Sequence, residues 1–232
     1  KTAVQNQKFE GISVWRPSVY YRLNDRFTLS YTQEFFSIYS PDEATKWQVS
    51  DGRLTLSDSN IATLPGDISI DGFIRLYLPT SENNRFLYKR RAQFYGYLGA
   101  SKSIGKFFLS YSLLAMYYVN SQDFYMAGSS PRPNKDYMIE NYIAAGYSFT
   151  SKLTATSTVG TIDNIYRSMP QYNVGVRRNT YFYGEVALSY AATKNVSLGA
   201  IVYNYTPFES NNHVNLLQDS DLSYIGVVSL RL

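Results

Sequence analysis

KFFLSYSLLAMYYVN, residues 106–120, is the stretch of the sequence that indicates the fold most clearly. Every odd position from Phe107 to Val119 carries an apolar or aromatic side chain, whereas the even positions mix small, polar and bulky groups. A period of two is typical of a β-strand, because successive side chains leave a strand on opposite faces. The stretch is longer than an ordinary strand of about five or six residues and matches the ~9–11 residues that cross a bilayer at a tilt. It predicts a membrane-spanning strand with lipid on one face and a wetter interior on the other.

The composition of the 232-residue chain agrees with a barrel and not with a helical membrane protein. No run of about 18 apolar residues occurs, which a transmembrane helix would need. The 23 tyrosines outnumber the 13 phenylalanines and two tryptophans, and tyrosine suits a membrane–water boundary. Cysteine is absent, so disulfides and thiolate metal sites are excluded. The N-terminal KTAVQNQKFEG lacks the apolar core of a signal peptide, so we expect the mature form of an exported protein, with its signal peptide removed.

The same alternation recurs along most of the chain. The strands that it predicts cover residues 9–23, 26–39, 46–57, 67–78, 86–100, 106–120, 137–149, 153–162, 181–190, 196–205 and 222–232. No segment shows a helical period with caps, so the sequence predicts an all-β protein. Single-chain bacterial barrels have an even number of strands. One further strand in residues 1–8 or 41–66 would give twelve, whereas ten would follow if 46–57 form a loop; residues 57–66 are expected to be rich in turns.

Tight turns alternate with long loops in the C-terminal half. Short turns are predicted at 101–105, 150–152 and 191–195, and long loops at 120–136, 163–178 and 206–221. A barrel with short periplasmic turns on one rim and longer extracellular loops on the other shows this rhythm. We therefore predict one domain over residues 1–232, a transmembrane antiparallel up-and-down β-barrel of about 12 strands (10–12).

In this pattern the chain resembles the outer-membrane β-barrels of Gram-negative bacteria, particularly small porins. The final strand, Tyr224–Leu232, alternates apolar positions to its end and looks like a barrel-assembly signal, although it ends in leucine where an aromatic is usual. Leu78-Pro79-Thr80-Ser81, followed by the Ser101–Gly105 turn, is similar to channel-like barrels described as meta-pathway phenol-degradation transporters. The resemblance implies a location in the bacterial outer membrane, contact with lipid and lipopolysaccharide, transport of small solutes, and assembly as a homo-oligomer.

Charged side chains that the alternation turns inward are the candidate functional residues. Seven are positive and four are negative, and such an excess tilts a narrow water-filled pore toward anions. The predicted lumen charges are Arg16, Arg22, Arg26, Glu34, Asp67, Asp71, Arg75, Lys89, Arg91, Glu185 and Arg231. Asp67 and Asp71 lie about 13 Å apart along one strand face, too far for a retaining glycosidase pair, and are expected to balance Arg75.

Bulky side chains on the predicted inner face favour a second interpretation. They are Phe73, Tyr77, Tyr95, Tyr97, Tyr181, Tyr183 and Tyr203. Side chains alone fill the interior of some barrels of modest strand number. The alternatives are therefore a passive diffusion channel that leans toward anions and a structural or interaction barrel with a closed lumen. Glycines on the outer face at positions 72, 96, 184 and 226 would permit close packing between barrels, or would ease strand curvature.

Enzymatic chemistry has little support in the sequence. His213 is the only histidine, and it lies in the predicted loop 206–221 without a serine two residues on. Asp219 and Asp221 in the same loop leave a membrane-embedded hydrolase resembling the omptins as a third alternative. No calcium-loop pattern occurs, so we expect no metal and no cofactor. The net charge of +4 is spread along the chain, and we expect no nucleic-acid partner.

Overall fold

The computed structural model describes residues 11–40, 43–194, 196–207 and 222–230. Its main sheet is antiparallel, which confirms the predicted all-β class. The strands of this sheet are β2 (Ser18–Arg22), β3 (Phe27–Thr32), β6 (Gly52–Leu64), β7 (Ile68–Leu78), β8 (Arg90–Ile104), β9 (Phe107–Asn120), β12 (Lys135–Ser148), β13 (Leu153–Tyr166), β14 (Arg177–Ala191), β15 (Val196–Pro207) and β16 (Leu222–Leu230). Their order is β16-β15-β14-β13-β12-β9-β8-β7-β6-β3-β2, an up-and-down meander.

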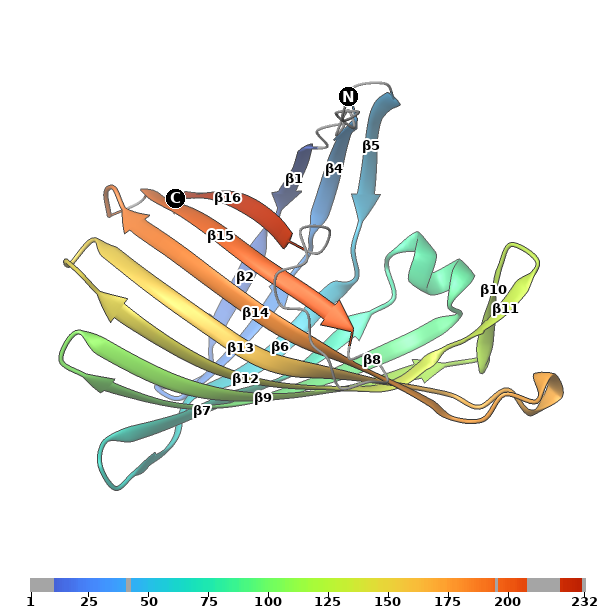
Figure 1. Cartoon of the computed structure of the whole chain (residues 1–232), viewed down its shortest axis with the longest axis horizontal. Helices are drawn as coiled ribbons and strands as arrows, with labels where there is room; N and C mark the ends of the chain where they lie inside the picture. Colours follow the sequence, from blue (N-terminus) through green and yellow to red (C-terminus); the bar gives the residue numbers. More distant parts are fainter. Residues whose placement is uncertain (1–10, 41–42, 195, 208–221, 231–232) are drawn as a thin grey trace, which may run out of the picture.

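The main sheet bends into a trough, with β2 and β16 as its two edges (Figure 1). Within the described residues each edge strand pairs with one neighbour, so the trough is not closed into a barrel. The sheet has 11 strands in this part of the chain, where the sequence predicts about twelve. Closure and a twelfth strand therefore stay predictions.

A smaller sheet continues the first three long strands beyond one rim of the trough. It contains β1 (Gly11–Trp15), β4 (Phe35–Ser40) and β5 (Glu43–Val49) in the order β1-β4-β5, and we call it the blade. Short breaks separate each blade strand from its continuation: residues 16–17 before β2, 33–34 after β3 and 50–51 before β6. Figure 1 shows the blade rising away from the trough. Residues 46–57 are therefore strand in two pieces, and their alternative interpretation as a loop is wrong.

The rim opposite the blade is formed by tight turns. β6 extends to Leu64, so the prediction of a turn-rich segment at 57–66 is wrong; only the pairing is irregular, between Asp58 and Ala62. The polar sequence there lies at a strand end, where side chains meet water and need not be apolar. The chain then turns through Gly66 and Asp67, which both have left-handed backbones (φ of 81° and 59°). We call this the turn rim.

The other rim, the loop rim, carries more regular structure than the sequence predicts. Residues 120–136 contain a hairpin of β10 (Phe124–Ala127) and β11 (Ser130–Pro133), and the predicted irregular loop is wrong. The loop predicted at 163–178 is shorter, because β13 and β14 extend beyond the predicted strands. The connection between them is residues 167–176, which contain a short 3₁₀ helix, η2 (Pro170–Tyr172). A π-helix, η1 (Asn83–Leu87), replaces the first residues of the strand predicted at 86–100.

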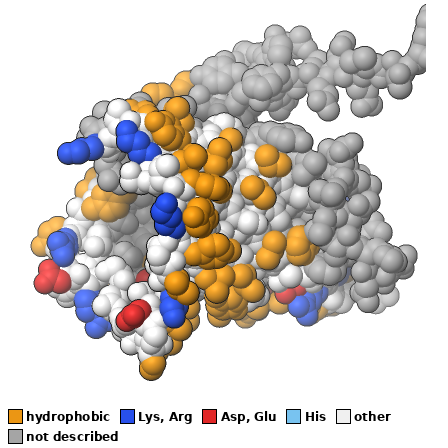
Figure 2. Space-filling view, turned by 60° about the vertical axis from the view of Figure 1, so that its left-hand side comes forward, with side chains coloured by type: hydrophobic (Ala, Val, Ile, Leu, Met, Phe, Trp, Pro, Cys, Tyr) orange, Lys and Arg blue, Asp and Glu red, His pale blue; other side chains and the backbone are white. Residues whose placement is uncertain are grey.

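Side-chain alternation on β9 follows the prediction. Leu109, Leu113 and the other odd positions up to Tyr117 are exposed on the convex face, whereas Leu114 and Tyr118 on the concave face are buried. Cross-strand register carries the same division from strand to strand, because residues directly opposite each other share a face. Figure 2 shows hydrophobic side chains gathered in a broad band over the face in view, with charged side chains mostly beside it. The convex face is therefore the apolar one.

Gly160 of β13 supplies a test of this packing. A Cβ atom there would collide with the backbone carbonyl of Asn141 on β12, which cannot move without breaking the strand pairing. We expect Gly160→Ala to lower the free energy of unfolding by about 1–3 kcal/mol, as overpacking does. Gly96→Ala on β8 is the matched control, because a Cβ there meets no atom within 4 Å. Heat-induced unfolding of the purified protein in detergent measures both, and an equal loss of stability in the two variants would contradict the described register.

Candidate functional site

Arg75 lies at the centre of the concave face. Strand pairing places it between Thr55 of β6 and Tyr95 of β8. Its Nε donates a hydrogen bond to Thr55 Oγ1 (2.9 Å) and its Nη1 donates one to the Tyr77 hydroxyl (3.2 Å). The guanidinium carbon is 4.6 Å from the ring centroid of Phe73 and 5.6 Å from that of Tyr95. In the described part of the chain no carboxylate forms an ion pair with Arg75, so aromatic faces and hydroxyls hold the charge in place without neutralising it.

Aromatic rings surround this guanidinium. Phe73 stacks on Tyr97 with centroids 5.0 Å apart, and Tyr95 lies 5.4 Å from Phe73 in a tilted arrangement. Tyr77 meets Tyr95 edge-on at 6.3 Å. All four rings lie on the inner face predicted from the alternation of β7 and β8. They make the concave face both bulky and polar, since each tyrosine ends in a hydroxyl.

A second cluster, on β12 and β14, combines carboxylates with tyrosines. The Tyr142 hydroxyl donates to Glu140 Oε2 (2.9 Å), and the Tyr183 hydroxyl donates to Glu185 Oε2. The two rings meet edge-on at 5.4 Å across β13, where Gly160 is paired with both tyrosines and has no side chain to separate them. The sequence analysis places Glu185 on the inner face. It does not include Glu140 there, although Glu140 directly follows the outward-facing Ile139.

A third cluster lies on the concave face near the loop rim, around Arg90. Its Nη1 donates to Gln93 Oε1 (3.1 Å), and its guanidinium carbon is 4.5 Å from the Tyr118 ring centroid. The sequence predicts instead that Arg91 points inward and that Arg90 breaks the outer face. The structure contradicts this, because a β-bulge inserts an extra residue, Arg91, between the Arg90–Asn120 and Ala92–Val119 pairs and shifts the alternation by one. Arg91 is exposed at the rim.

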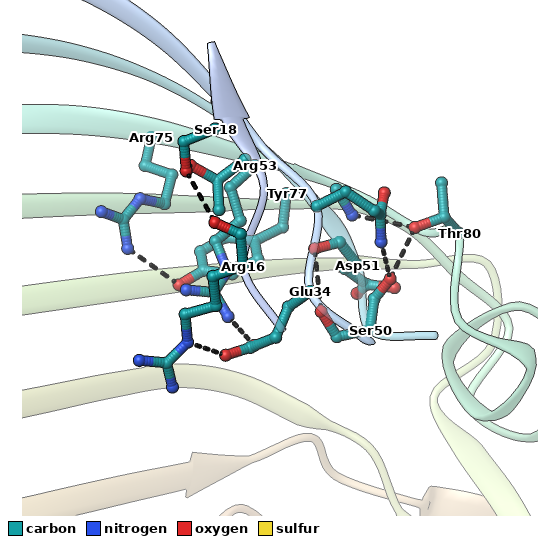
Figure 3. A network of polar contacts seen from close by, with 12 residues as sticks. Arg16, Ser18, Glu34, Ser50, Asp51, Arg53, Arg75, Tyr77 and Thr80 are labelled. Atoms are coloured by element: carbon teal, nitrogen blue, oxygen red, sulfur yellow. Dashed lines mark hydrogen bonds and ion pairs between the residues drawn. The ribbon is translucent and has the colours of Figure 1, made fainter. Parts of the chain in front are cut away.

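Glu34 takes a different place from the predicted lumen position. It lies at the break between β3 and β4, where it accepts hydrogen bonds from Arg16 Nε and Arg53 Nη2 (Figure 3). Its side chain is 4% exposed, compared with 63% for Arg16 and 21% for Arg53. The carboxylate therefore links the break between β1 and β2, the break between β3 and β4, and the start of β6, where the blade leaves the trough. Arg53 was missed because neither face of residues 46–57 is consistently apolar.

Further hydrogen bonds fix the same break, which we call the hinge. The Ser50 carbonyl accepts from Gln33 Nε2 (2.7 Å) and from Thr80 Oγ1 (2.8 Å), as Figure 3 shows for Thr80. Asp51 accepts from the backbone N–H of Ser81 (2.9 Å) and from Asn84 Nδ2 (2.5 Å). These contacts connect the break between β5 and β6 to Thr80, Ser81 and η1. The hinge is thus a polar structure at the loop rim.

Other predicted residues lie at the rims. Arg22 pairs with Asp25 (3.1 Å) and Arg26 with Asp58, both at the turn rim. Asp67 lies in the turn before β7, because the strand begins one residue later than predicted. Lys89 lies in the loop before β8.

The sequence predicts that Asp67 and Asp71 balance the charge of Arg75, but neither aspartate forms an ion pair with it. Asp71 is on the concave face opposite Gly99, and it makes no ion pair with Arg75. Arg231 and His213 lie outside the described residues. Within 11–40, 43–194, 196–207 and 222–230, no three His, Cys, Asp or Glu residues gather into a possible metal site. No helix in those ranges has the length and apolar character needed to cross a membrane.

Arg167 anchors the loop rim outside the trough. It donates to Asp136 Oδ1 (3.1 Å) and to Asp123 Oδ1 (2.9 Å), which lie on either side of the β10–β11 hairpin. Burial of the guanidinium acts to lower its pKa, but the two carboxylates outweigh this, and the pKa lies above its ordinary value. Arg167 therefore stays charged and holds the base of the hairpin.

Comparison with known proteins identifies structural similarity to an outer membrane channel. No protein-family model and no curated protein sequence matches the chain. An outer membrane channel from Pseudomonas putida F1, known from its crystal structure, is similar with a TM-score of 0.65 at 15% sequence identity. The match covers 96% of this chain and 84% of that channel. Similarity at this identity concerns the fold alone, so the antiparallel sheet of this chain is similar in fold to that channel.

Removing the Glu34 carboxylate tests the hinge. Glu34→Gln leaves Arg16 and Arg53 without their counter-charge, and we expect the free energy of unfolding to fall by about 1.5 kcal/mol, the lower end for hydrogen bonds to charged groups. Tryptophan fluorescence is a suitable measurement, because both tryptophans of the chain, Trp15 and Trp47, lie on the blade. Urea unfolding of Glu82→Gln serves as control, since Glu82 is exposed. Equal unfolding midpoints for wild type and Glu34→Gln would show that the contacts of Glu34 with Arg16 and Arg53 do not stabilise the blade.

Proposed function

We propose that the protein is a single outer-membrane β-barrel domain that lets small solutes diffuse through its lumen, with a mild preference for anions and no enzymatic activity. The observation that carries the proposal is the contrast between the two faces of one curved sheet. The convex face is apolar and exposed, whereas the concave face carries charges and tyrosine hydroxyls around Arg75. The similarity of the fold to an outer membrane channel supports the same function.

The apolar convex face supports a membrane location. Large hydrophobic side chains are exposed on successive strands, among them Ile74 (64%), Phe94 (51%) and Val186 (60%). A continuous surface of this kind in water would be an aggregation liability, since soluble monomers rarely expose apolar patches of more than a few hundred Å². In hydrocarbon the same side chains are at no disadvantage, and an alternation of apolar and polar residues is typical of barrel strands.

Closure of the barrel follows from the same environment. An unpaired backbone N–H or C=O group in hydrocarbon costs several kcal/mol, so open sheet edges do not face lipid. We therefore infer that β2 and β16 are both paired in the membrane, either with each other or with a further strand between them. The further strand would bring the barrel to about twelve strands. Contact with lipid and lipopolysaccharide follows from this arrangement.

The anion preference rests on the charges of the concave face and hinge. Within the described residues six cations lie there against five carboxylates, and such an excess favours anions in a narrow pore. The cations are Arg16, Arg53, Arg75, Arg90, Lys135 and Arg177, and the carboxylates are Glu34, Asp51, Asp71, Glu140 and Glu185. The bulge moves Arg91 out of this set and Arg90 into it. Arg75 is one of the members that form no ion pair within the described residues.

A closed structural barrel that associates with copies of itself is the second candidate. A depression of about 570 Å³ on the convex face surrounds Gly96 and is lined mainly by apolar side chains such as Ile74, Phe94 and Tyr117. The stacked rings of Tyr181 and Tyr205, 4.5 Å apart, add bulk to the concave face and would narrow a lumen. Both features suit a barrel whose function depends on its outer wall.

Planar-bilayer recording separates the two candidates. We expect discrete conductance steps, with reversal potentials in a salt gradient that favour the anion. Arg75→Glu should reduce or reverse that preference, because it changes the charge at the centre of the concave face by two units. Lys152→Glu makes the same change of charge in an exposed turn and should leave the preference nearly unchanged. If correctly folded protein gives no steps at any voltage, the channel is wrong and the structural barrel is favoured.

A further inference from the structure

The segment from Pro79 to Arg91 concentrates positive charge at the loop rim. It holds four cations, Arg85, Lys89, Arg90 and Arg91, against the single carboxylate of Glu82, so its net charge is +3 of the chain's +4. The segment enters η1 after the hinge and leaves it into β8. Because the rest of the chain is nearly balanced, this segment is the main positively charged feature of the protein.

The four cations line one depression. Its volume is about 490 Å³, and its other lining residues are Pro79, Phe86 and Ser121. Lys89 has a left-handed backbone (φ 51°), which is uncommon for a residue with a side chain. Two hydrogen bonds hold it there, since the Lys89 carbonyl accepts from the Ser121 N–H (3.0 Å) and from Ser121 Oγ (2.9 Å). The loop that presents the cations is therefore fixed to the start of the β9–β10 connection.

These cations lack carboxylate partners in the described part of the chain. None of the four takes part in an ion pair there, unlike Arg16, Arg26 and Arg167. The nearby Asp51 is already engaged by the Ser81 N–H and by Asn84. The Nε atom of Arg90 is buried and has no hydrogen-bond partner. Cations that line one depression without a carboxylate partner form a site that an external anionic group would complete.

Apolar side chains beside the cations indicate what kind of anion fits. Phe86 and Leu87 of η1 are 59% and 38% exposed, and Phe86 lines the same depression. A free anion gains nothing from these side chains, whereas a lipid would place its phosphate on the cations and its chain against the phenyl ring. The loop rim is also where the apolar wall ends, which is the depth of a lipid headgroup in the proposed barrel.

We propose that the depression lined by Arg85, Lys89, Arg90 and Arg91 binds the phosphate of an anionic lipid headgroup, with Phe86 against the lipid chain. This rests on the membrane location in the proposed function, but not on conduction through the lumen. The bound lipid would neutralise the basic segment and hold η1 at the membrane surface. Arginine and lysine are both suited to phosphate, the first through paired hydrogen bonds and the second as a point charge.

Binding of diphosphoryl lipid A to the protein in phosphatidylcholine nanodiscs tests the site. At about a fivefold loss per neutralised cation, Arg85→Gln/Lys89→Gln/Arg91→Gln should weaken binding on the order of a hundredfold. Arg90 is left in place because it packs against Tyr118. The matched control, Lys102→Gln/Lys152→Gln/Lys194→Gln, removes three cations near the turn rim and should bind as wild type does. Equal affinity of the two triple variants would overturn the proposal.

Two further arms identify the source of the phosphate. Phe86→Ala should weaken the binding of diphosphoryl lipid A. It should leave unchanged the affinity of the site for inorganic phosphate, measured by competition. If inorganic phosphate alone displaces the lipid completely and Phe86→Ala has no effect, the site takes free anions and the lipid assignment is wrong. Wild-type protein that fails to insert into nanodiscs would contradict the proposed function itself. Protein that inserts and conducts, but binds lipid A no better than phosphatidylcholine, would contradict only this site.

Discussion

Backbone hydrogen bonding is the constraint on which the rest of this structure depends, and it is strictest in the membrane location that we propose. In hydrocarbon every N–H and C=O must find a partner within the protein, and a continuous antiparallel sheet satisfies this from strand to strand. The pleat then sends alternate side chains to opposite faces, so one sequence pattern specifies both an apolar wall and a polar interior. Arg75 with its tyrosines on one face and Ile74 and Phe94 on the other are products of the same alternation.

Departures from this regular pattern gather at the loop rim. There the first three long strands break, and the Glu34 carboxylate joins Arg16 and Arg53 where the blade begins. The bulge at Arg90 and Arg91 redirects one cation inward and leaves the other at the rim. In the proposed membrane location, both features place charge where the sheet would leave the hydrocarbon and meet water. The trough thus has a uniform centre and a loop rim on which its specific contacts are concentrated.

Sequence periodicity was sufficient for the centre of the sheet and insufficient for its ends. β9 and the concave position of Arg75 follow from alternation, because the convex face is apolar along the whole length of the central strands. Glu140 was also within reach of that rule. Alternation predicts strands over most of the blade, but it predicts neither the breaks that separate them from the main sheet nor the β10–β11 hairpin, because both faces of a strand are wet beyond the proposed membrane. A bulge adds one residue without a clear sequence signal, so the alternation assigns Arg90 and Arg91 to the wrong faces.

The central claim is that β9 separates lipid from water. Single cysteines at Ser110 and Ser112, on the concave face, and at Leu109 and Leu113, on the convex face, test it in native membranes through their reaction with a small water-soluble maleimide. The account predicts that the two concave positions react and the two convex positions do not, because only the lumen contains water. Reaction at the convex positions as fast as at the concave ones would contradict it.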